Sequence, residues 1–230
     1  MRSSTSKDKI QTTMLERLTV GPIAENAYVI LEGSSCTIVD PGAEARRILS
    51  FLDSRGLVPS LIVATHGHLD HTAAIPEILA AWLARGVEIP LAAHADDASY
   101  FGEKGEGTNR ALFAAIGALG YFTTYWRPIP APQILLSDGD TLPGGSYRTI
   151  HSPGHSRGSL CLYDAASSIL ISGDTLFRDG VGRTDGPDSD GAALQASLRR
   201  LLELPPGTRV FPGHGEETTI GREAGLIDSN

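Results

Sequence analysis

Residues 65–71 of this chain read Thr65-His66-Gly67-His68-Leu69-Asp70-His71, with three histidines and one aspartate within six positions. The stretch directly follows the apolar run 61–64, which predicts a buried β-strand. Imidazole and carboxylate groups are the side chains that hold zinc, iron or manganese in proteins. The chain of 230 residues has only seven histidines, so chance gives such a cluster in about one in a thousand sequences, or fewer. The stretch therefore predicts a metal site at the end of a strand.

Three later loops repeat this arrangement, in which a strand-like run is followed by glycine and a polar side chain. They are Pro153-Gly154-His155 after 147–150, Gly173-Asp174-Thr175 after 169–172, and Pro212-Gly213-His214-Gly215 after 209–211. Loops at strand ends can aim side chains into one cleft, and glycine lets backbones approach closely. We expect all four loops to meet at one site.

The predicted ligands divide into two metal positions. One ion would be held by His66, His68 and His155. The other would be held by Asp70, His71 and His214. Asp174 would bridge the two ions, and a bridging water of lowered pKa would be the nucleophile. We expect two divalent ions, with zinc first and with iron or manganese suiting the same ligands.

Three other polar residues near these loops have structural interpretations. His94 ends a strand-like run without a partner motif, and His151 precedes Ser152-Pro153. Both histidines are expected to make hydrogen bonds rather than to bind metal. Asp40, in Asp40-Pro41-Gly42, suits either a hydrogen bond to a ligand or a loop-shaping role.

Apolar periodicity in the rest of the chain predicts an α/β fold. Strands are expected at 15–20, 27–31, 37–40, 61–64, 89–93, 133–136, 147–150, 159–163, 169–172 and 209–211, and helices at 45–55, 73–83, 110–119 and 192–202. Two halves of strands flanked by helices indicate a layered sandwich with both sheet faces covered, as a single domain over residues 13–230. Residues 1–12 are polar and are expected to form a flexible N-terminus.

Residues 95–132 interrupt this order with glycines, acidic residues and an aromatic cluster. The cluster consists of Tyr121, Phe122, Tyr125 and Trp126. We interpret the segment as a helical insertion or lid whose aromatic rings pack within the protein in preference to stacking on a ligand. A dimer surface is an equally open interpretation.

Composition limits the class of partner. A net charge of −8 argues against nucleic acid or an anionic membrane, because phosphate groups need a basic surface. Cys36 and Cys161 lie in apolar runs and are expected to be buried rather than bonded to each other. The longest apolar stretch, 111–122, is too short to span a bilayer. We expect a cytoplasmic protein with a small-molecule substrate, and its oligomeric state stays open.

Together these motifs resemble the metallo-β-lactamase superfamily over roughly residues 15–223. Within it they resemble the glyoxalase II-like (hydroxyacylglutathione hydrolase) group. The resemblance is carried by Val20-Gly21-Pro22 with Asn26 and Tyr28, by Asp40-Pro41-Gly42, by 65–71, 153–156, 173–177 and 212–215, and by Gly182-Arg183-Thr184-Asp185. The short bacterial type, which lacks the long C-terminal helical domain, is the most similar. The resemblance implies an αββα four-layer sandwich.

The same resemblance implies hydrolysis of a thioester such as S-lactoylglutathione by a metal-bridging hydroxide. Asp70 and Asp174 are then the catalytic candidates, with Asp70 orienting the hydroxide or accepting its proton. Arg183 falls where the family often has a basic residue near the substrate, so it is the candidate substrate contact. The alternative for Arg183 is a surface ion pair in a loop.

Two other functions are compatible with the motifs. The first is an iron-dependent persulfide dioxygenase, from a similar group that shares residues 182–185 and holds its iron with two histidines and one aspartate. The second is a catalytically silent, metal-bearing protein that binds a partner through 95–132. A true β-lactamase is disfavoured, because cysteine typically stands where this chain has Asp174. Nuclease members need substrate-binding extensions that the sequence lacks.

Overall fold

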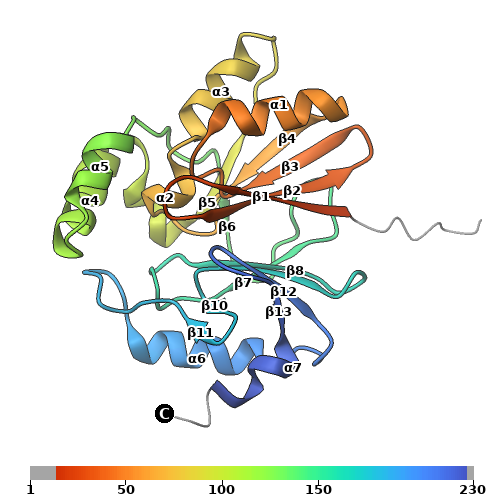
Figure 1. Ribbon diagram of the computed structural model, residues 1–230, viewed down its shortest axis with the longest axis vertical. Coiled ribbons are helices and arrows are strands. Elements are labelled where there is room, and N and C mark those ends of the chain that lie inside the picture. Colours follow the sequence, from red (N-terminus) through yellow and green to blue (C-terminus); the bar gives the residue numbers. More distant parts are fainter. Residues whose placement is uncertain (1–13, 227–230) are drawn as a thin grey trace, which may run out of the picture.

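Two β-sheets lie face to face with helices on their outer sides. The computed structural model describes residues 14–226. The first sheet has six strands in the order β1-β2-β3-β4-β5-β6. These strands are β1 (Met14–Val20), β2 (Glu25–Glu32), β3 (Ser35–Val39), β4 (Val58–Val63), β5 (Leu91–His94) and β6 (Ile134–Leu136). Helices α1 (Ala45–Arg55) and α3 (Ile75–Leu83) cover its outer face, as Figure 1 shows.

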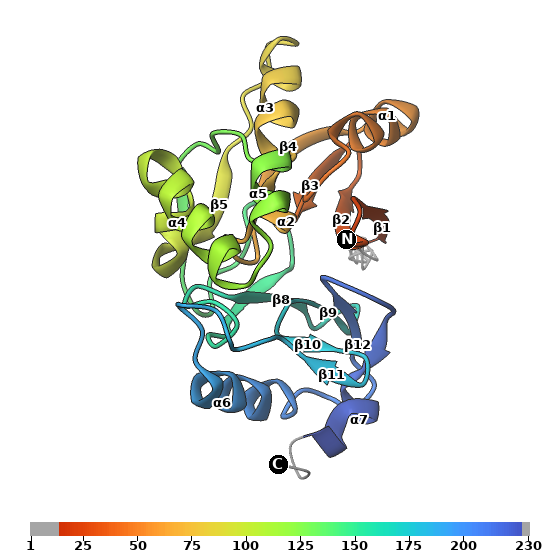
Figure 2. The ribbon, with the colours of Figure 1, turned by 60° about the vertical axis from the view of Figure 1, so that its left-hand side comes forward.

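The second sheet has five strands in the order β13-β12-β9-β8-β7. Its strands are β7 (Arg148–His151), β8 (Leu160–Asp164), β9 (Ile169–Gly173), β12 (Arg209–Pro212) and β13 (Thr218–Thr219). Helices α6 (Gly191–Leu201) and α7 (Ile220–Glu223) lie on its outer side (Figure 2), with a short 3-10 helix, η2 (Ala224–Leu226), after α7. A two-stranded ribbon of β10 (Leu176–Phe177) and β11 (Gly180–Val181) follows β9. The predicted α/β four-layer sandwich is confirmed.

The side chains of each sheet pack into two apolar cores, one on each face of the sheet. On β2, Tyr28 and Ile30 face the core between the sheets, whereas Ala27 and Val29 belong to the core beneath the outer helices. In the same way Cys161 of β8 joins the core under α6, while its neighbours face the first sheet. Successive side chains of a strand point to opposite faces, so a strand covered on both sides appears as a continuous apolar run.

Strand direction brings the predicted loops together. Strands β3 and β4 are parallel, and so are β9 and β12. The loops after β3 and β4 therefore leave from one edge of the first sheet. The loops after β9 and β12 leave from the corresponding edge of the second. The backbone N–H of Asp40 donates to the carbonyl of Val63 at 2.9 Å, which joins the first two loops at their base.

Residues 95–132 are more helical than expected. They form a 3-10 helix η1 (Ala95–Tyr100), then α4 (Gly102–Ala115) and α5 (Leu119–Tyr125). The expected helix over 110–119 is wrong at both ends. Helix α4 begins eight residues earlier, directly after the extended residue Phe101, and the chain breaks at Gly117, whose φ is +75°. Glycines within 102–107 concealed the start of the helix, because they lower helix propensity.

The expected helix over 73–83 is present as α3 (Ile75–Leu83), which begins two residues later than expected and follows a separate short helix. A four-residue helix α2 (Leu69–Thr72) carries Asp70 and His71, and α3 then begins at Ile75. The proposed flexible N-terminus at 1–12 lies outside the described residues. Within 14–226, no helix is both long and apolar enough to cross a membrane. Cys36 and Cys161 are buried and free, as expected.

Candidate metal centre

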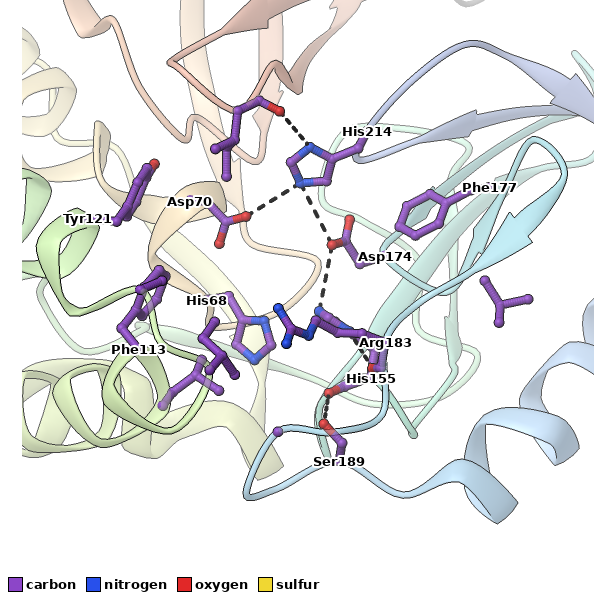
Figure 3. A pocket seen from close by; sticks show the side chains of 16 residues that line it. His68, Asp70, Phe113, Tyr121, His155, Asp174, Phe177, Arg183, Ser189 and His214 are labelled. Carbon is purple, nitrogen blue, oxygen red and sulfur yellow. Dashed lines mark hydrogen bonds and ion pairs between the residues drawn. The ribbon is translucent and has the colours of Figure 1, made fainter.

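The four predicted loops converge at the edge where the two sheets meet (Figure 3). His66 and His68 lie in the loop after β4, and Asp70 and His71 on α2. The other three side chains come from the second half of the chain, after β7, β9 and β12 respectively: His155, Asp174 and His214. Residues more than 140 positions apart in the sequence thus share one centre.

The side chains form the two groups that the sequence predicts. Ligand atoms of one group lie within 4.8 Å of one another: His66, His68 and His155. Those of the other group do likewise: Asp70, His71 and His214. Asp174 lies between the groups, with its Oδ1 3.3 Å from His71 Nε2 and its Oδ2 3.6 Å from His155 Nε2. The same Oδ2 is 3.8 Å from His214 Nε2.

Several polar atoms of the centre are buried without a hydrogen-bond partner. They are Nε2 of His66, His68, His71 and His155, and Oδ1 of Asp174. A buried polar atom without a partner costs roughly 1–3 kcal/mol, and five such atoms facing one another would be a large penalty. A pair of divalent ions would give every one of them a partner. The donor set of imidazoles and carboxylates therefore fits metal.

Hydrogen bonds to the opposite ring nitrogen fix how these histidines are oriented. The Nδ1–H of His155 donates to the Arg183 carbonyl at 3.0 Å, and that of His214 donates to the Ile23 carbonyl at 3.3 Å. A carbonyl only accepts, so Nδ1 carries a proton and Nε2 is the nitrogen that faces the centre.

Asp40 combines the two roles that the sequence left open. Its Oδ2 lies 3.1 Å from Nδ1 of His71 and so orients that ring. Its oxygens also accept from the backbone N–H of Thr65 at 2.7 Å and from the Thr65 hydroxyl at 2.6 Å. Thr65 in turn contacts Nδ1 of His66 at 3.1 Å. One buried carboxylate therefore holds both the loop and one of its histidines.

Burial and neighbouring charges set the protonation of the centre. Burial lowers the pKa of His68 to about 3 and holds the pKa of His66 well below its ordinary value. Both imidazoles are therefore neutral near pH 7, as metal ligation requires. Burial alone would raise the pKa of Asp174, but His71 and the other histidines hold it below its usual range. Asp174 is thus ionised.

Glycines beside the ligands allow the backbone to approach them. A Cβ on Gly213 would lie 2.3 Å from Oδ1 of Asp174 and 2.5 Å from Cε1 of His71. A Cβ on Gly42 would lie 1.6 Å from the carbonyl oxygen of Asp70. Neither position has room for a side chain, which explains why glycine stands in these loops.

The resemblance also drew attention to Asn26 and Tyr28, and the structure gives them a shared task. The Asn26 side-chain amide donates to the carbonyls of Pro212 and Gly215 at 3.0 and 2.9 Å. The Tyr28 hydroxyl donates to the Pro212 carbonyl at 2.7 Å. Two side chains of the first sheet therefore fix the loop that carries His214.

Sequence reasoning missed two buried carboxyl groups. Asp97 accepts from Gly67 N at 2.8 Å, from the Ser156 hydroxyl at 2.8 Å and from Gly158 N at 2.6 Å. It thereby joins the loop of His66 and His68 to the loop of His155. No local pattern distinguishes Asp97 from its exposed neighbour Asp96.

The second missed group is Glu25, at the start of β2. It is buried, neither carboxyl oxygen has a hydrogen-bond partner, and Oε1 is 3.9 Å from Nδ1 of His71. Burial raises its pKa well above the ordinary value. An acidic residue that opens a strand is usually exposed, so no pattern in the sequence predicts this burial.

His94 and His151 lie outside the centre and contact each other. Their rings stack with centroids 3.9 Å apart and planes at 11°. His94 Nδ1 accepts the backbone N–H of Asp96 at 3.2 Å, and His151 Nε2 donates to the Arg157 carbonyl at 2.9 Å. These contacts agree with the hydrogen-bonding roles expected for both residues, although their pairing was not foreseen.

A cavity of about 560 Å³ opens over the centre. The metal-centre side chains that line it are His68, Asp70, His155, Asp174 and His214. Arg183, the candidate substrate contact, is at its edge, where its guanidinium Nε and Nη2 donate to the carboxylate of Asp185 at 2.6 and 2.8 Å. The ion pair expected of Arg183 is thus present, and its contact with a substrate stays a prediction.

The fold and the centre define a class of metal-dependent hydrolases, and the comparisons agree. A family model described as "Metallo-beta-lactamase superfamily" matches residues 20–214. The chain belongs to this superfamily.

Among its relatives is the "Probable metallo-hydrolase YqgX" of Bacillus subtilis, 34% identical over 89% of this chain and 91% of that protein. "Hydroxyacylglutathione hydrolase GloC" of Haemophilus influenzae is 31% identical over 91% of this chain and 94% of that protein. The solved structure "TTHA1623 in a di-iron-bound form" is 38% identical, with a TM-score of 0.78 over 91% of this chain and 96% of that one. These relatives support a metal-dependent hydrolase in general. The di-iron form leaves the metal's identity open.

Proposed function

We propose that this protein is a dinuclear metal-dependent hydrolase that acts on a thioester such as S-lactoylglutathione. The observation that carries the proposal is the set of buried, unpartnered Nε2 atoms around Asp174 at the floor of a cavity. Its general part, metal-dependent hydrolysis, is supported by that donor set, which suits metal binding, and by the metallo-hydrolase relatives. The thioester is supported by the similarity to GloC. Zinc is the metal we propose, with iron or manganese as alternatives.

The reaction adds water across the carbon–sulfur bond. The water oxygen joins the carbonyl carbon, the bond to sulfur breaks, and a carboxylate and a thiol are released. Two divalent ions bound here supply a water of lowered pKa and positive charge beside the developing oxyanion. A thiolate leaves readily, so protonation of the leaving group is not demanding.

Asp70 and Asp174 have separate roles in this proposal. Asp174 lies between both ligand groups, so one of its oxygens could serve each of two bound ions. Asp70 has a carboxylate oxygen 3.4 Å from His214 Nε2 and lines the cavity, which suits it to orient the water and accept its proton. Burial opposes ionisation of Asp70, yet its contact with His214 keeps its pKa below the ordinary value.

Arg183 is proposed to contact a polar end of the substrate. Its side chain is 50% exposed and lies at the edge of the cavity. Two of its N–H groups are engaged by Asp185, which fixes the plane of the guanidinium. The remaining N–H groups can donate to a carboxylate or an amide of the substrate.

The proposal is tested by assaying protein loaded separately with zinc, iron and manganese for S-lactoylglutathione hydrolysis. Glutathione-persulfide-dependent oxygen uptake is measured beside it. We expect thioester turnover that His68→Ala lowers at least about 100-fold, whereas His151→Ala, a histidine outside the centre, changes it little. Oxygen uptake by the iron-loaded protein without thioester turnover would establish the dioxygenase instead. Inactivity in both assays would favour the ligand-binding alternative.

A further inference from the structure

The cavity above the metal centre has walls of unlike chemistry. One wall comes from the segment α4–α5 and is wholly apolar or aromatic: Leu112, Phe113, Ile116, Ala118 and Tyr121. Phe177 and Val181 of the β10–β11 ribbon, with Ile23, add further apolar surface. The polar edge holds Arg183 and Ser189. Figure 3 shows Phe113 and Tyr121 on the side of α4–α5, away from Ser189.

The aromatic part of this wall is held in place by stacking. The rings of Phe113 and Tyr121 stack with centroids 5.4 Å apart and planes at 12°. Tyr121 in turn contacts Tyr125, with ring centroids 4.5 Å apart. Phe113 is buried in the core under the first sheet. A surface whose side chains are already ordered loses little freedom when a ligand covers it.

Charge in the cavity is confined to the centre and the edge. Apart from the histidines of the centre, Arg183 is the only cationic side chain among the described residues that line it. Its Nε and Nη2 are engaged by Asp185. Apart from the hydroxyl of Tyr121, this wall offers no hydrogen-bonding side chain to a hydroxyl or a carboxylate, and a polar group placed against Leu112, Phe113 or Ile116 would lose its water without compensation.

We infer that the preferred substrates are thioesters whose acyl group is an apolar chain, seated against α4–α5. This inference rests on the proposed thioester hydrolysis and specifies its substrate class. The carbonyl lies over the metal centre, the acyl chain covers Phe113, Ile116 and Tyr121, and the polar thiol half extends toward Arg183 and Ser189. A cavity of about 560 Å³ is in the range that encloses small-molecule ligands.

The inference predicts how rate depends on the acyl chain at constant thiol. The substrates are S-lactoyl-, S-butyryl-, S-hexanoyl- and S-octanoylglutathione, assayed with the metal-loaded full chain. Burial of one methylene corresponds to roughly a fourfold factor, so the two methylenes added from butyryl to hexanoyl should raise kcat/KM by about 16-fold. It should also exceed the value for lactoyl. A flat or falling series, or lactoyl as the best substrate, would overturn the inference.

A pair of variants tests whether the apolar wall of α4–α5 causes the preference for a longer acyl chain. Ile116 is half-buried and lines the cavity, whereas Leu119, at the start of α5, is 43% exposed and does not line it. Ile116→Ser should lower the ratio of hexanoyl to lactoyl kcat/KM at least about fivefold. Leu119→Ser should leave that ratio unchanged. Equal ratios in both variants would show that the wall does not select the acyl group.

A binding measurement separates failure of this inference from failure of the proposed function. The thioethers S-methylglutathione and S-hexylglutathione cannot be hydrolysed, and their affinities are measured by calorimetry. If no thioester is turned over but S-hexylglutathione binds at least tenfold more tightly, the proposed reaction is wrong and the apolar subsite stands. If both thioethers bind equally, the subsite is wrong whatever the enzyme hydrolyses.

Discussion

Four histidines of the centre contact a partner through Nδ1 and turn Nε2 toward the other ligands, so one contact fixes the orientation of each ring: His66, His71, His155 and His214. The candidate ligands themselves were predictable, because His66, His68, Asp70 and His71 are crowded into one short stretch. Asp97 and Glu25 were not, because their importance comes from burial among loops distant in sequence. A residue that positions others has no local pattern of its own.

The first prediction concerns Asp97. Asp97→Asn keeps the shape of the side chain but cannot accept all three hydrogen bonds, from Gly67, Ser156 and Gly158. We expect metal affinity to fall about 10- to 100-fold, as is typical when a group that orients ligands is lost. Competition with a chromophoric chelator measures it, and Asp96→Asn is the exposed control. Equal affinities for the two variants would refute this role.

The second prediction concerns pH and the metal-free protein. The folded-state pKa of His68 is about 3, below the ordinary 6.5. Between these values the unfolded chain binds a proton at His68 that the folded chain does not, so stability is lost as pH falls. The free energy of unfolding of wild type, minus that of His68→Gln, should fall by roughly 1 kcal/mol per pH unit as the pH falls from 6.5 toward the folded-state pKa. Urea denaturation at several pH values measures it, and a difference independent of pH would contradict it.

At the scale of elements, strand and helix types were largely predictable and their ends were not. Helix α1 spans Ala45–Arg55 as expected, because its apolar residues recur at helical spacing and Gly56 follows in the left-handed region with φ +62°. The ribbon β10–β11 and strand β13 were missed, since each strand has only two residues. Their pairing depends on neighbours that the sequence does not specify.

The third prediction compares a glycine in the loop after β3 with a glycine within α4. Gly42→Ala should displace α2, because the added Cβ would meet the carbonyl of Asp70 at 1.6 Å, and we expect a loss of roughly 2 kcal/mol or more and weaker metal binding. Gly107→Ala is the matched control, since nothing lies within 4 Å of its Cβ and it is within α4. Helix propensity should make that variant more stable by up to about 1 kcal/mol. Thermal unfolding measures the stability of both variants. A Gly42→Ala protein as stable as wild type would contradict the proposed contact with Asp70.

At the scale of the whole molecule, the centre joins the two sheets. The ligands of residues 66–71 follow β4, a strand of the first sheet. His155, Asp174 and His214 follow strands of the second sheet. The sequence predicted this union because its motifs come from both halves of the chain. It did not predict how Asn26, Tyr28 and Asp97 brace the halves, because those contacts cross about 60 to 190 positions.

The fourth prediction follows from this joining. A ligand at 1,000 times its dissociation constant stabilises the folded state by about 4 kcal/mol per site. Removing metal with a chelator should therefore lower Tm by roughly 10 °C or more for a chain of this size. Differential scanning calorimetry before and after reloading measures the change. Asp174→Asn should show a smaller shift, and an identical Tm with and without metal would contradict a centre that joins the sheets.

The most direct test of the account is the number of metal ions bound per chain. Protein loaded with excess zinc, iron or manganese is freed of unbound metal by gel filtration and analysed by inductively coupled plasma mass spectrometry. The two groups of ligands around Asp174 predict two ions per chain for the metal that supports hydrolysis. One ion per chain in the fully active protein, or none, would contradict the dinuclear centre.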